Sequence, residues 1–321
     1  MSTATSSYSR TVSVSVPATS ANLGPGFDCL GLALELRNEV TVTATGPDLT
    51  WEHPQATEYD VKVSGVDAAK VPAGRDNLLV EAAETLFRHV GRRPSQVSVR
   101  MVNRIPVGSG LGSSSSAIVA GLMAANSVIN GCFSERDLLR LAVEMEGHPD
   151  NVAPALLGGL VLGILPDAAA GPAELICRRM EPPELVAVVV LPDFHLLTAE
   201  ARAVLPASIS RADAIFNTSR LGLLLLALLT GDTDCLRVAT ADRLHQPYRL
   251  TLIPGAEAAY AAAYDAGAVA VALSGAGPSL LAFTLGEEAA IGQAMGDAFA
   301  AASLSSRTWV LRPSADGALC W

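Results

Sequence analysis

Three glycine-rich turns, far apart in a chain of 321 residues, constrain the fold more than any other feature of the sequence. They lie at residues 17–34, 106–117 and 274–283. Glycine allows the backbone to adopt positive φ and to approach a ligand or another segment closely. A simple tight turn would explain each of them taken alone. Three such turns in one chain favour loops that converge on a shared site.

The central turn, PVGSGLGSSSSA at residues 106–117, has the chemistry of an anion site. Apolar residues recur at helical spacing after the serines, which predicts a helix that begins inside the serine run. A helix N-terminus offers free N–H groups and the positive end of the dipole, and the serine hydroxyls add further donors. The alternative is a flexible Gly/Ser connector or an ordinary helix cap.

This turn lacks the lysine of the Walker nucleotide loop, in which Gly-Lys-Ser or Gly-Lys-Thr follows a glycine after four residues. Only two of the 22 basic residues are lysines, Lys62 and Lys70. Both precede the turn, so we expect no lysine to reach it from elsewhere. Backbone N–H groups, serines and a metal ion would then have to hold a phosphate.

The first half of the chain alternates predicted strands and helices. Alternation of apolar and polar residues predicts strands at 10–18, 38–46 and 96–107. Helices are expected at 76–91, capped by Asp76 and ended by Gly91, and at 134–147, with Ser134 as N-cap.

The second half begins after a soft stretch at 166–175, where we place a loop or a domain boundary. The expected elements are a buried strand at 184–192, a long helix at 210–231, a second helix at 233–246, two strands with a turn at 268–284, a helix at 286–302 and a final strand at 307–313. The chain length suits two domains. We expect two α+β domains, 1–170 and 171–321, which share a site between them.

Composition excludes several classes of function. The net charge of −10 argues against nucleic acid as the main partner, because phosphate backbones require a basic surface. Five scattered cysteines lack the spacing of metal or redox sites. The run LGLLLLALL from Leu221 is too short to span a bilayer and is expected to be buried. The N-terminus does not resemble a signal peptide, so a cytoplasmic protein without a membrane partner is expected.

Four segments together resemble the GHMP kinases, the superfamily named for galactokinase, homoserine kinase, mevalonate kinase and phosphomevalonate kinase. They are NLGPGFDCLGLAL at 22–34, the serine-rich turn, EGHPDNVAPALLGG at 146–159 and SGAGPS at 274–279, and they are most similar to the homoserine kinase branch. The likeness extends over nearly the whole chain, from about residue 11 to 312. It implies an N-terminal domain like ribosomal protein S5, a ferredoxin-like C-terminal domain and a homodimer.

The activity that this resemblance implies is phosphoryl transfer from ATP to the hydroxyl of L-homoserine, which gives O-phospho-L-homoserine for threonine biosynthesis. Phosphoryl transfer requires positioning and neutralisation of charge more than covalent help. We therefore expect ATP and Mg²⁺ as cofactors.

The nucleotide end is assigned by the same resemblance. The serine-rich turn would hold the ATP phosphates and Asn77 would lie near the adenine. Mg²⁺ keeps most of its waters and takes one or two protein oxygens, expected here from Ser116 or a neighbouring serine and from Glu146, with Glu144 as the alternative. The expected nucleotide-binding residues are Asn77, Pro106, Val107, Gly108, Ser109, Gly110, Leu111, Gly112, Ser113, Ser114, Ser115 and Ser116.

The acceptor end is implied to combine both halves of the chain. Asp28, with Asn22 beside it, is expected to bind the amine of the substrate. Arg202 and Arg249 are expected to bind its carboxylate, because a guanidinium pairs with a carboxylate through two hydrogen bonds. Thr198 lies one helical turn from Arg202. The alternatives are a turn-capping role for Asp28 and a surface role for the arginines.

His148 and Asn151 are the expected catalytic residues. Mevalonate-type relatives carry an aspartate where this chain has Asn151, and an asparagine takes up no proton at neutral pH. The resemblance therefore implies that Asn151 positions the hydroxyl, whose proton passes to a phosphate oxygen directly or through water. Asp150 is expected to form local hydrogen bonds only.

Two other functions remain open at this stage. One is a kinase of the same superfamily with a different alcohol, and the other is a nucleotide-binding regulator without catalysis. Asn151, Arg202 and Arg249 favour an amino-acid acceptor over mevalonate, and Glu146 with the serine-rich turn argues against the regulator.

Overall fold

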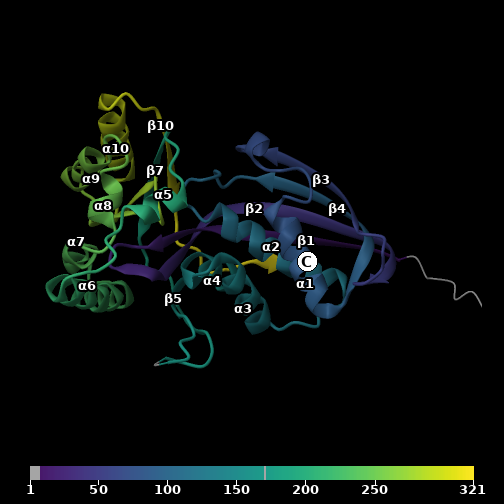
Figure 1. Cartoon of the computed structure of the whole chain (residues 1–321). Coiled ribbons are helices and arrows are strands. Elements are labelled where there is room, and N and C mark those ends of the chain that lie inside the picture. Colours follow the sequence, from purple (N-terminus) through teal and green to yellow (C-terminus); the bar gives the residue numbers. More distant parts are fainter. Residues whose placement is uncertain (1–7, 170) are drawn as a thin grey trace, which may run out of the picture.

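The computed structural model describes residues 8–169 and 171–321, which form two lobes on separate β-sheets (Figure 1). The sheet of the first lobe has the order β11-β1-β2-β4-β3, and β5 and β6 extend it from β2. Its strands are β1 (Tyr8–Asn22), β2 (Gly26–Thr50), β3 (Glu58–Gly65), β4 (Arg92–Asn103), β5 (Leu160–Ile164), β6 (Ile176–Met180) and β11 (Leu319–Cys320).

Helices α1 (Leu78–Val90), α2 (Ser113–Val128), α3 (Glu135–Glu146) and α4 (Pro149–Leu157) bury the core of the first lobe against this sheet. The short 3₁₀ turn η1 (Ala68–Lys70) precedes α1. Strand β3 is parallel to β4, and α1 lies on the connection between them. The other pairs of this sheet are antiparallel.

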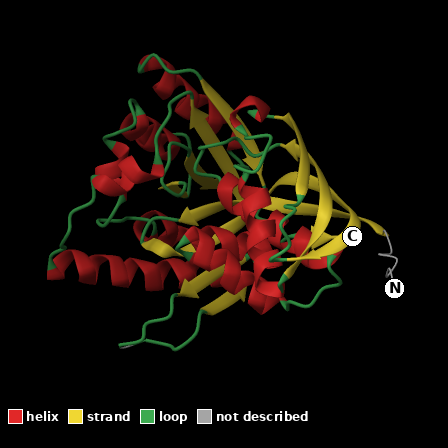
Figure 2. Ribbon diagram, turned by 45° about the vertical axis from the view of Figure 1, so that its right-hand side comes forward, coloured by secondary structure: helices red, strands yellow, loops and turns green. Residues whose placement is uncertain are grey.

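The second lobe has an antiparallel sheet in the order β10-β7-β9-β8. Its strands are β7 (Val186–Pro192), β8 (Ala270–Leu273), β9 (Leu280–Thr284) and β10 (Ser306–Leu311). Its helices are α5 (Thr198–Ala203), α6 (Arg211–Thr230), α7 (Leu236–Ala239), α8 (Gln246–Leu250), α9 (Ala256–Asp265) and α10 (Glu288–Ala301), with the 3₁₀ turn η2 (Thr233–Cys235). Figure 2 shows that helices and strands are mixed in both lobes, which confirms the expected α+β class.

The β1–β2 hairpin belongs to both lobes. Pairing of the two strands shifts register at Pro17/Ala18 and again at Ala21/Asn22, where the ribbon bends. Beyond the bend, Leu30, Leu32 and Leu34 are fully buried in a core shared with β7 and α6. The tip of the hairpin, residues 22–28, is thereby fixed against the second lobe.

Most expected elements are confirmed, with differences at their ends. The cap of α1 is Asn77 and not Asp76, because the Asn77 side chain accepts the N–H of Leu79. Gly91 ends this helix in a left-handed conformation, and Ser134 forms a capping box with Asp137 at α3. Strand β10 is not the final strand, because β11 follows it and pairs with β1.

The helix expected at 233–246 is wrong. The chain forms η2 and α7, turns at residues 240–245, and begins α8 at Gln246. The Asp242 carboxylate accepts the backbone N–H groups of Leu244, His245 and Gln246, and this local capping breaks the helix.

The expected division at 170/171 falls beside residue 170, which lies outside the described residues. Strands β5 and β6 flank this point and pair with each other in the first sheet. The second sheet begins only with β7, and β11 returns to the first. The boundary or loop expected at 166–175 therefore lies between two paired strands of the first lobe.

Helix α6 differs from its expected burial. It is the one helix of the described residues long and apolar enough to cross a membrane by length and composition, yet only 22% of its apolar window is buried. Ile215, Leu226 and Leu229 are more than half exposed, at 63%, 59% and 56%. In Figure 2 it is the long helix at the edge of the molecule.

Candidate active site

The serine-rich turn joins β4 to α2 and requires its glycines. Gly108, Gly110 and Gly112 have φ of 66°, 79° and 68°, a conformation that other residues rarely adopt. A Cβ at Gly110 would lie 2.3 Å from the carbonyl oxygen of Ser274. A Cβ at Gly112 would lie 2.0 Å from the Thr19 hydroxyl. The turn is therefore pressed against both of the other glycine-rich turns.

Hydrogen bonds connect the three turns directly. The N–H of Thr19 donates to the carbonyl of Leu111 (3.1 Å), and the Asn22 side chain donates to the carbonyl of Gly275 (2.9 Å). The Ser274 hydroxyl donates to the carbonyl of Gly110 (2.7 Å). The convergence expected from the sequence is confirmed.

A cavity of about 370 Å³ opens where the three turns meet. Most of the expected site residues line it, namely Asn22, Asp28, Asn77, Val107, Gly108, Ser109, Gly110, Gly112, Ser113, Ser114, Glu146, His148, Asn151, Thr198, Arg202 and Arg249. Helix α2 begins at this wall with Gly112 as its N-cap and no side-chain cap, so the N–H groups of its first turn are available to an anion.

Pro106, Leu111, Ser115 and Ser116 do not line the cavity. Leu111 is fully buried, and the carbonyl of Pro106 accepts the hydroxyl of Ser109 inside the turn. Ser116 is 1% exposed and accepts a hydrogen bond from Asn38. These four residues therefore support the turn and do not face the cavity.

Glu146, at the end of α3, faces the serines at the start of α2. Its Oε1 accepts hydrogen bonds from the hydroxyls of Ser114 (3.2 Å) and Ser115 (3.1 Å). No such contact connects it to Ser116 in the described part of the chain, because Ser116 is turned toward Asn38. Glu144 is exposed and pairs with Arg140 on the outer face of α3. A carboxylate and hydroxyls form an oxygen donor set that suits Mg²⁺.

The expectation that no lysine reaches the serine-rich turn is wrong. Lys70 lines the same cavity, so a lysine from before the turn does reach it. It pairs with Asp67 (3.4 Å), whose other oxygen accepts the N–H of Val107. Asn77 is 1% exposed. Its side chain accepts the N–H of Leu79 and donates to the carbonyl of Pro72.

The acceptor end contains an ion pair between the two lobes. Arg202, on α5, donates to both carboxylate oxygens of Asp28, on β2, at 2.8 and 3.0 Å. The N–H of Asp28 donates to Asn22, which also holds Gly275. Thr198 begins α5 and is exposed at the same cavity. A negative and a positive group thus lie side by side in one wall.

Arg249, on α8, is 1% exposed and is the largest fully buried side chain among the described residues. It donates to the carbonyls of Ala201 (3.0 Å) and Gly275 (3.2 Å). Burial, followed by the charge of Arg202, lowers the pKa of Arg249 to about 10. It stays a cation at neutral pH, and the pairing of a cation so buried with an anion in the cavity is favourable.

His148 lies at the N-terminus of α4, and its Nδ1 is 2.5 Å from the Asp150 carboxylate. Burial disfavours its charged form, but the hydrogen bond and charge of Asp150, with Asp28 and Glu146, outweigh burial and raise the His148 pKa. Potential ligand atoms of Asp28, His148 and Asp150 lie within 4.8 Å of one another.

Asn151 accepts a hydrogen bond from the hydroxyl of Thr19 (2.8 Å) and faces the cavity.

Besides Lys70, the sequence reasoning missed Phe27 and Thr19, and it gave Asp150 a local role only. Asp150 lines the cavity as well as holding His148. The Phe27 ring lies under the guanidinium groups of both Arg202 and Arg249, at 5.8 and 5.0 Å. Thr19 links the first turn to Asn151. Phe27 directly precedes Asp28 in the sequence, and this was the one sequence signal that could have placed it at the site.

Comparisons with known proteins decide the family. The family model for the GHMP kinase N-terminal domain matches residues 77–159, and the model for the C-terminal domain matches residues 224–301. A homoserine kinase of Moorella thermoacetica is 44% identical over 307 residues, which cover 95% of this chain and 98% of that protein. The chain belongs to the homoserine kinases of the GHMP family.

Further relatives support the assignment of this chain to the GHMP kinases. A homoserine kinase of Nostoc punctiforme is 46% identical over 84% of this chain and 85% of its own length. The crystal structure of a homoserine kinase from Cytophaga hutchinsonii superposes with a TM-score of 0.83 at 30% identity, covering 97% of both chains. Leishmania major mevalonate kinase, at 16% identity and a TM-score of 0.65, shares the fold. Membership makes this chain an ATP-dependent kinase with an alcohol acceptor.

Proposed function

We propose that the enzyme transfers the γ-phosphoryl group of ATP to the hydroxyl of L-homoserine and forms O-phospho-L-homoserine, a step of threonine biosynthesis. One observation carries the proposal: the Asp28–Arg202 pair and the buried Arg249 share a cavity with the free N-terminus of α2. An α-amino acid is a zwitterion, so its amine and its carboxylate match the two signs of charge in this wall.

For the amino acid, we assign the amine to Asp28 and the carboxylate to Arg202 and Arg249. Each Asp28 oxygen already accepts one hydrogen bond from Arg202 and has a further lone pair for an ammonium. Thr198, on the first turn of α5, and Asn22, which fixes the backbone of Asp28, complete this end. Mevalonate carries no ammonium group, so it would offer no cation to the remaining lone pairs of Asp28.

For the nucleotide, we assign the phosphates to the backbone of residues 107–114 and to the first turn of α2. Asn77 and Lys70 line the same cavity, and we assign the nucleoside to the part of it beside Asn77. The residues fit a magnesium ion, which Glu146 and the hydroxyl of Ser114 or Ser115 would hold in place of the Ser116 expected from the sequence. When bound, Mg²⁺ neutralises charge on the transferring phosphates.

For the chemical step, we assign positioning of the acceptor hydroxyl to Asn151 and His148, which line the same cavity as the first residues of α2. The hydroxyl oxygen forms a bond to the γ-phosphorus as the bond to the β-phosphate oxygen breaks and ADP leaves. The proton of the hydroxyl passes to a phosphoryl oxygen directly or through water. The raised pKa of His148 favours its cationic form, which suits a donor beside the phosphates and not a base.

We also propose that the enzyme is a cytoplasmic homodimer that uses the exposed face of α6. Ile215, Gly222 and Leu229 are seven residues apart on one stripe of this helix, and Leu226 lies beside them. Nothing in the described chain lies within 4 Å of a Cβ at Gly222, although a helical glycine costs about 1 kcal/mol relative to alanine. Close contact with a second helix would account for this glycine.

An antiparallel pairing of two α6 helices centred on Gly222 is self-complementary. It places Ile215 of one copy opposite Leu229 of the other, and exposed Arg211 near exposed Asp232. Sedimentation equilibrium of Leu226→Glu should give the mass of a monomer, while Thr230→Glu at the end of the same helix should leave the dimer intact. A parent protein that sediments as a monomer at micromolar concentration would refute the dimer.

The activity is tested by incubating the purified enzyme with ATP–Mg²⁺ and a panel of alcohols and by measuring ADP release. We expect turnover with L-homoserine and none with mevalonate or galactose. Turnover with another alcohol alone would reassign the acceptor. ATP binding without turnover of any alcohol would contradict the kinase and support a regulator.

A further inference from the structure

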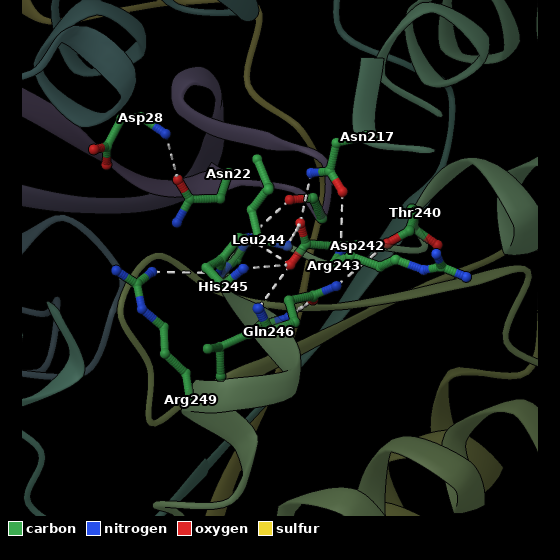
Figure 3. Close-up of polar contacts among 12 residues, drawn as sticks. Asn22, Asp28, Asn217, Thr240, Asp242, Arg243, Leu244, His245, Gln246 and Arg249 are labelled. Atoms are coloured by element: carbon green, nitrogen blue, oxygen red, sulfur yellow. Dashed lines mark hydrogen bonds and ion pairs between the residues drawn. The ribbon is translucent and has the colours of Figure 1, made fainter. Parts of the chain in front are cut away.

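Arg249 is held without a carboxylate partner, so its position depends on neutral groups. In the described part of the chain its guanidinium contacts the carbonyl oxygens of Ala201 and Gly275. It also contacts the Nδ1 of His245, at 3.4 Å (Figure 3). Both His245 and Arg249 belong to α8 or its N-cap, four residues apart and therefore on one side of the helix. The conformation of α8 thus decides where the guanidinium lies.

The start of α8 is fixed by one buried carboxylate. Oδ1 of Asp242 accepts the Asn217 side chain (2.7 Å) and the N–H of Leu244 (2.9 Å). Its Oδ2 accepts the N–H groups of His245 (2.9 Å) and Gln246 (2.7 Å). Figure 3 shows these contacts gathered around Asp242, between α6 and α8. Four hydrogen bonds hold this carboxylate, and Nε2 of His245 lies 3.6 Å from its Oδ2.

The His245 ring is fully buried and its tautomer follows from its partners. Nε2 lies 2.8 Å from the carbonyl oxygen of Gly24, which can only accept, so Nε2 carries the hydrogen. Nδ1 is then an acceptor for the guanidinium of Arg249. Burial lowers the pKa of His245 and the Arg249 charge lowers it further, against the Asp242 charge, so the ring is neutral.

Phe27 connects the same ring to the amine side of the cavity. It stacks on His245 with ring centroids 5.1 Å apart and an interplanar angle of 18°. The residue after Phe27 is Asp28, and the carbonyl that His245 holds belongs to Gly24 in the same hairpin tip. His245 therefore contacts both the segment that carries Asp28 and the side chain of Arg249.

We propose that His245 is a positioning residue that selects an amino-acid acceptor by fixing Arg249 relative to the hairpin tip that carries Asp28. This inference rests on the proposed function, which assigns the substrate carboxylate to Arg249. The neutral imidazole supplies an acceptor for one N–H of the guanidinium, and it leaves the positive charge uncompensated for the substrate. A carboxylate in its place would neutralise that charge, and an apolar residue would leave the guanidinium free to turn.

Two substitutions separate the two hydrogen bonds of the ring. His245→Asn keeps an acceptor near the position of Nδ1, and His245→Gln keeps a donor near the position of Nε2. Steady-state kinetics would give kcat and KM for L-homoserine and for ATP. Competition with 3-aminopropan-1-ol, which is homoserine without its carboxylate, would give an inhibition constant that does not involve Arg249.

We expect His245→Gln to raise the KM for homoserine about tenfold, the effect of one lost hydrogen bond to a charged group. The KM for ATP and the inhibition constant of 3-aminopropan-1-ol should change less than twofold, and His245→Asn should restore most of the homoserine affinity. His89→Gln, on the exposed face of α1, is the matched control. Equal weakening of homoserine and 3-aminopropan-1-ol, or equal values for the two variants, would show a structural role and overturn the proposal.

A second measurement uses the unmodified enzyme and does not depend on whether a variant folds. The ¹⁵N spectrum of labelled histidine should show His245 as the neutral Nε2–H tautomer at pH 7, with an Nδ1 shift that changes on addition of homoserine. An imidazolium or an Nδ1–H tautomer would refute the role of the ring as acceptor. Absence of homoserine turnover by the unmodified enzyme would instead refute the proposed function, so the two failures are distinguishable.

Discussion

The two ends of the active-site cavity are built in different ways. The phosphate end is one continuous segment, residues 107–114, that presents backbone N–H groups and hydroxyls. The acceptor end is assembled from Asp28 on β2, Arg202 on α5 and Arg249 on α8, which lie far apart in the sequence. The first end carries little formal charge apart from Glu146, and the second carries charges of both signs.

This difference shows how one fold can keep its donor and vary its acceptor. Phosphates are common to every reaction with ATP, so a local loop and a helix N-terminus are sufficient for them. Recognition of the acceptor depends on side chains from separate elements, each of which can change without disturbing the loop. The ends are connected through Asn22, which joins the hairpin tip to Gly275, and through Ser274, whose hydroxyl donates to the carbonyl of Gly110.

The largest expected effect concerns the phosphate end. Glu146→Gln removes the carboxylate that faces Ser114 and Ser115, and we expect kcat to fall by about 100-fold or more. The KM for homoserine should change little if the ends are independent. Glu144→Gln, on the exposed face of the same helix, is the control and should retain full activity. A similar loss in both variants would move the metal site away from Glu146.

Arg249→Leu should have the next largest effect, at the acceptor end. We expect the KM for homoserine to rise about 10- to 100-fold, because a charged hydrogen bond contributes about 1.5–3 kcal/mol, with little change in the KM for ATP. Arg237→Leu, an exposed arginine on α7, is the matched control. Loss of affinity for both substrates to the same degree would make Arg249 structural and would remove the distinction between the ends.

Gly110→Ala should damage both ends together, because Gly110 lies against the turn that Asn22 also holds. Its Cβ would meet the Ser274 carbonyl at 2.3 Å in a left-handed conformation. We expect a loss of more than about 2 kcal/mol in the free energy of unfolding and weaker binding of both substrates. Gly108→Ala has the same strain, but its Cβ would meet nothing closer than the His195 ring at 3.9 Å. Chemical denaturation should therefore show a cost of only about 1 kcal/mol. Equal costs would argue against close packing of the turns.

The smallest expected effect is the pH dependence at His148, between the two ends. Its pKa is raised on folding, so its contribution to stability is complete below the unfolded pKa and is lost as pH rises through the folded pKa. His148→Gln should therefore cost more free energy of unfolding at pH 5.5 than at pH 9. A cost independent of pH would contradict a charged His148 in the folded enzyme.

The sequence was sufficient for features that are local. Gly91 and Ser134 cap their helices as expected, and the serine-rich turn leads into a helix because its glycines and serines act on neighbouring backbone. The choice between Asn77 and Asp76 as a cap, or between Ser116 and its neighbours beside Glu146, depends on the rotation of a helix. Adjacent residues of one type do not reveal that rotation.

The sequence did not predict features that depend on contacts between residues far apart in the chain. The break in the helix expected at 233–246 requires Asn217 to join Asp242, which is 25 residues away along the chain. The role of Phe27 follows from two arginines of the other lobe. Lys70 reaches the cavity because η1 lies beside the serine-rich turn, a position that chain order does not indicate.

The return of β11 to the first sheet has a consequence for the order of folding during synthesis. Val14 and Ser15 pair with Cys320 and Leu319, and Arg37 donates to the carbonyl of Gly317. The edge strand of the first lobe is therefore made only after the ribosome has completed the second lobe. Until then β1 has an unpaired edge, which is a surface for contact with chaperones or other nascent chains.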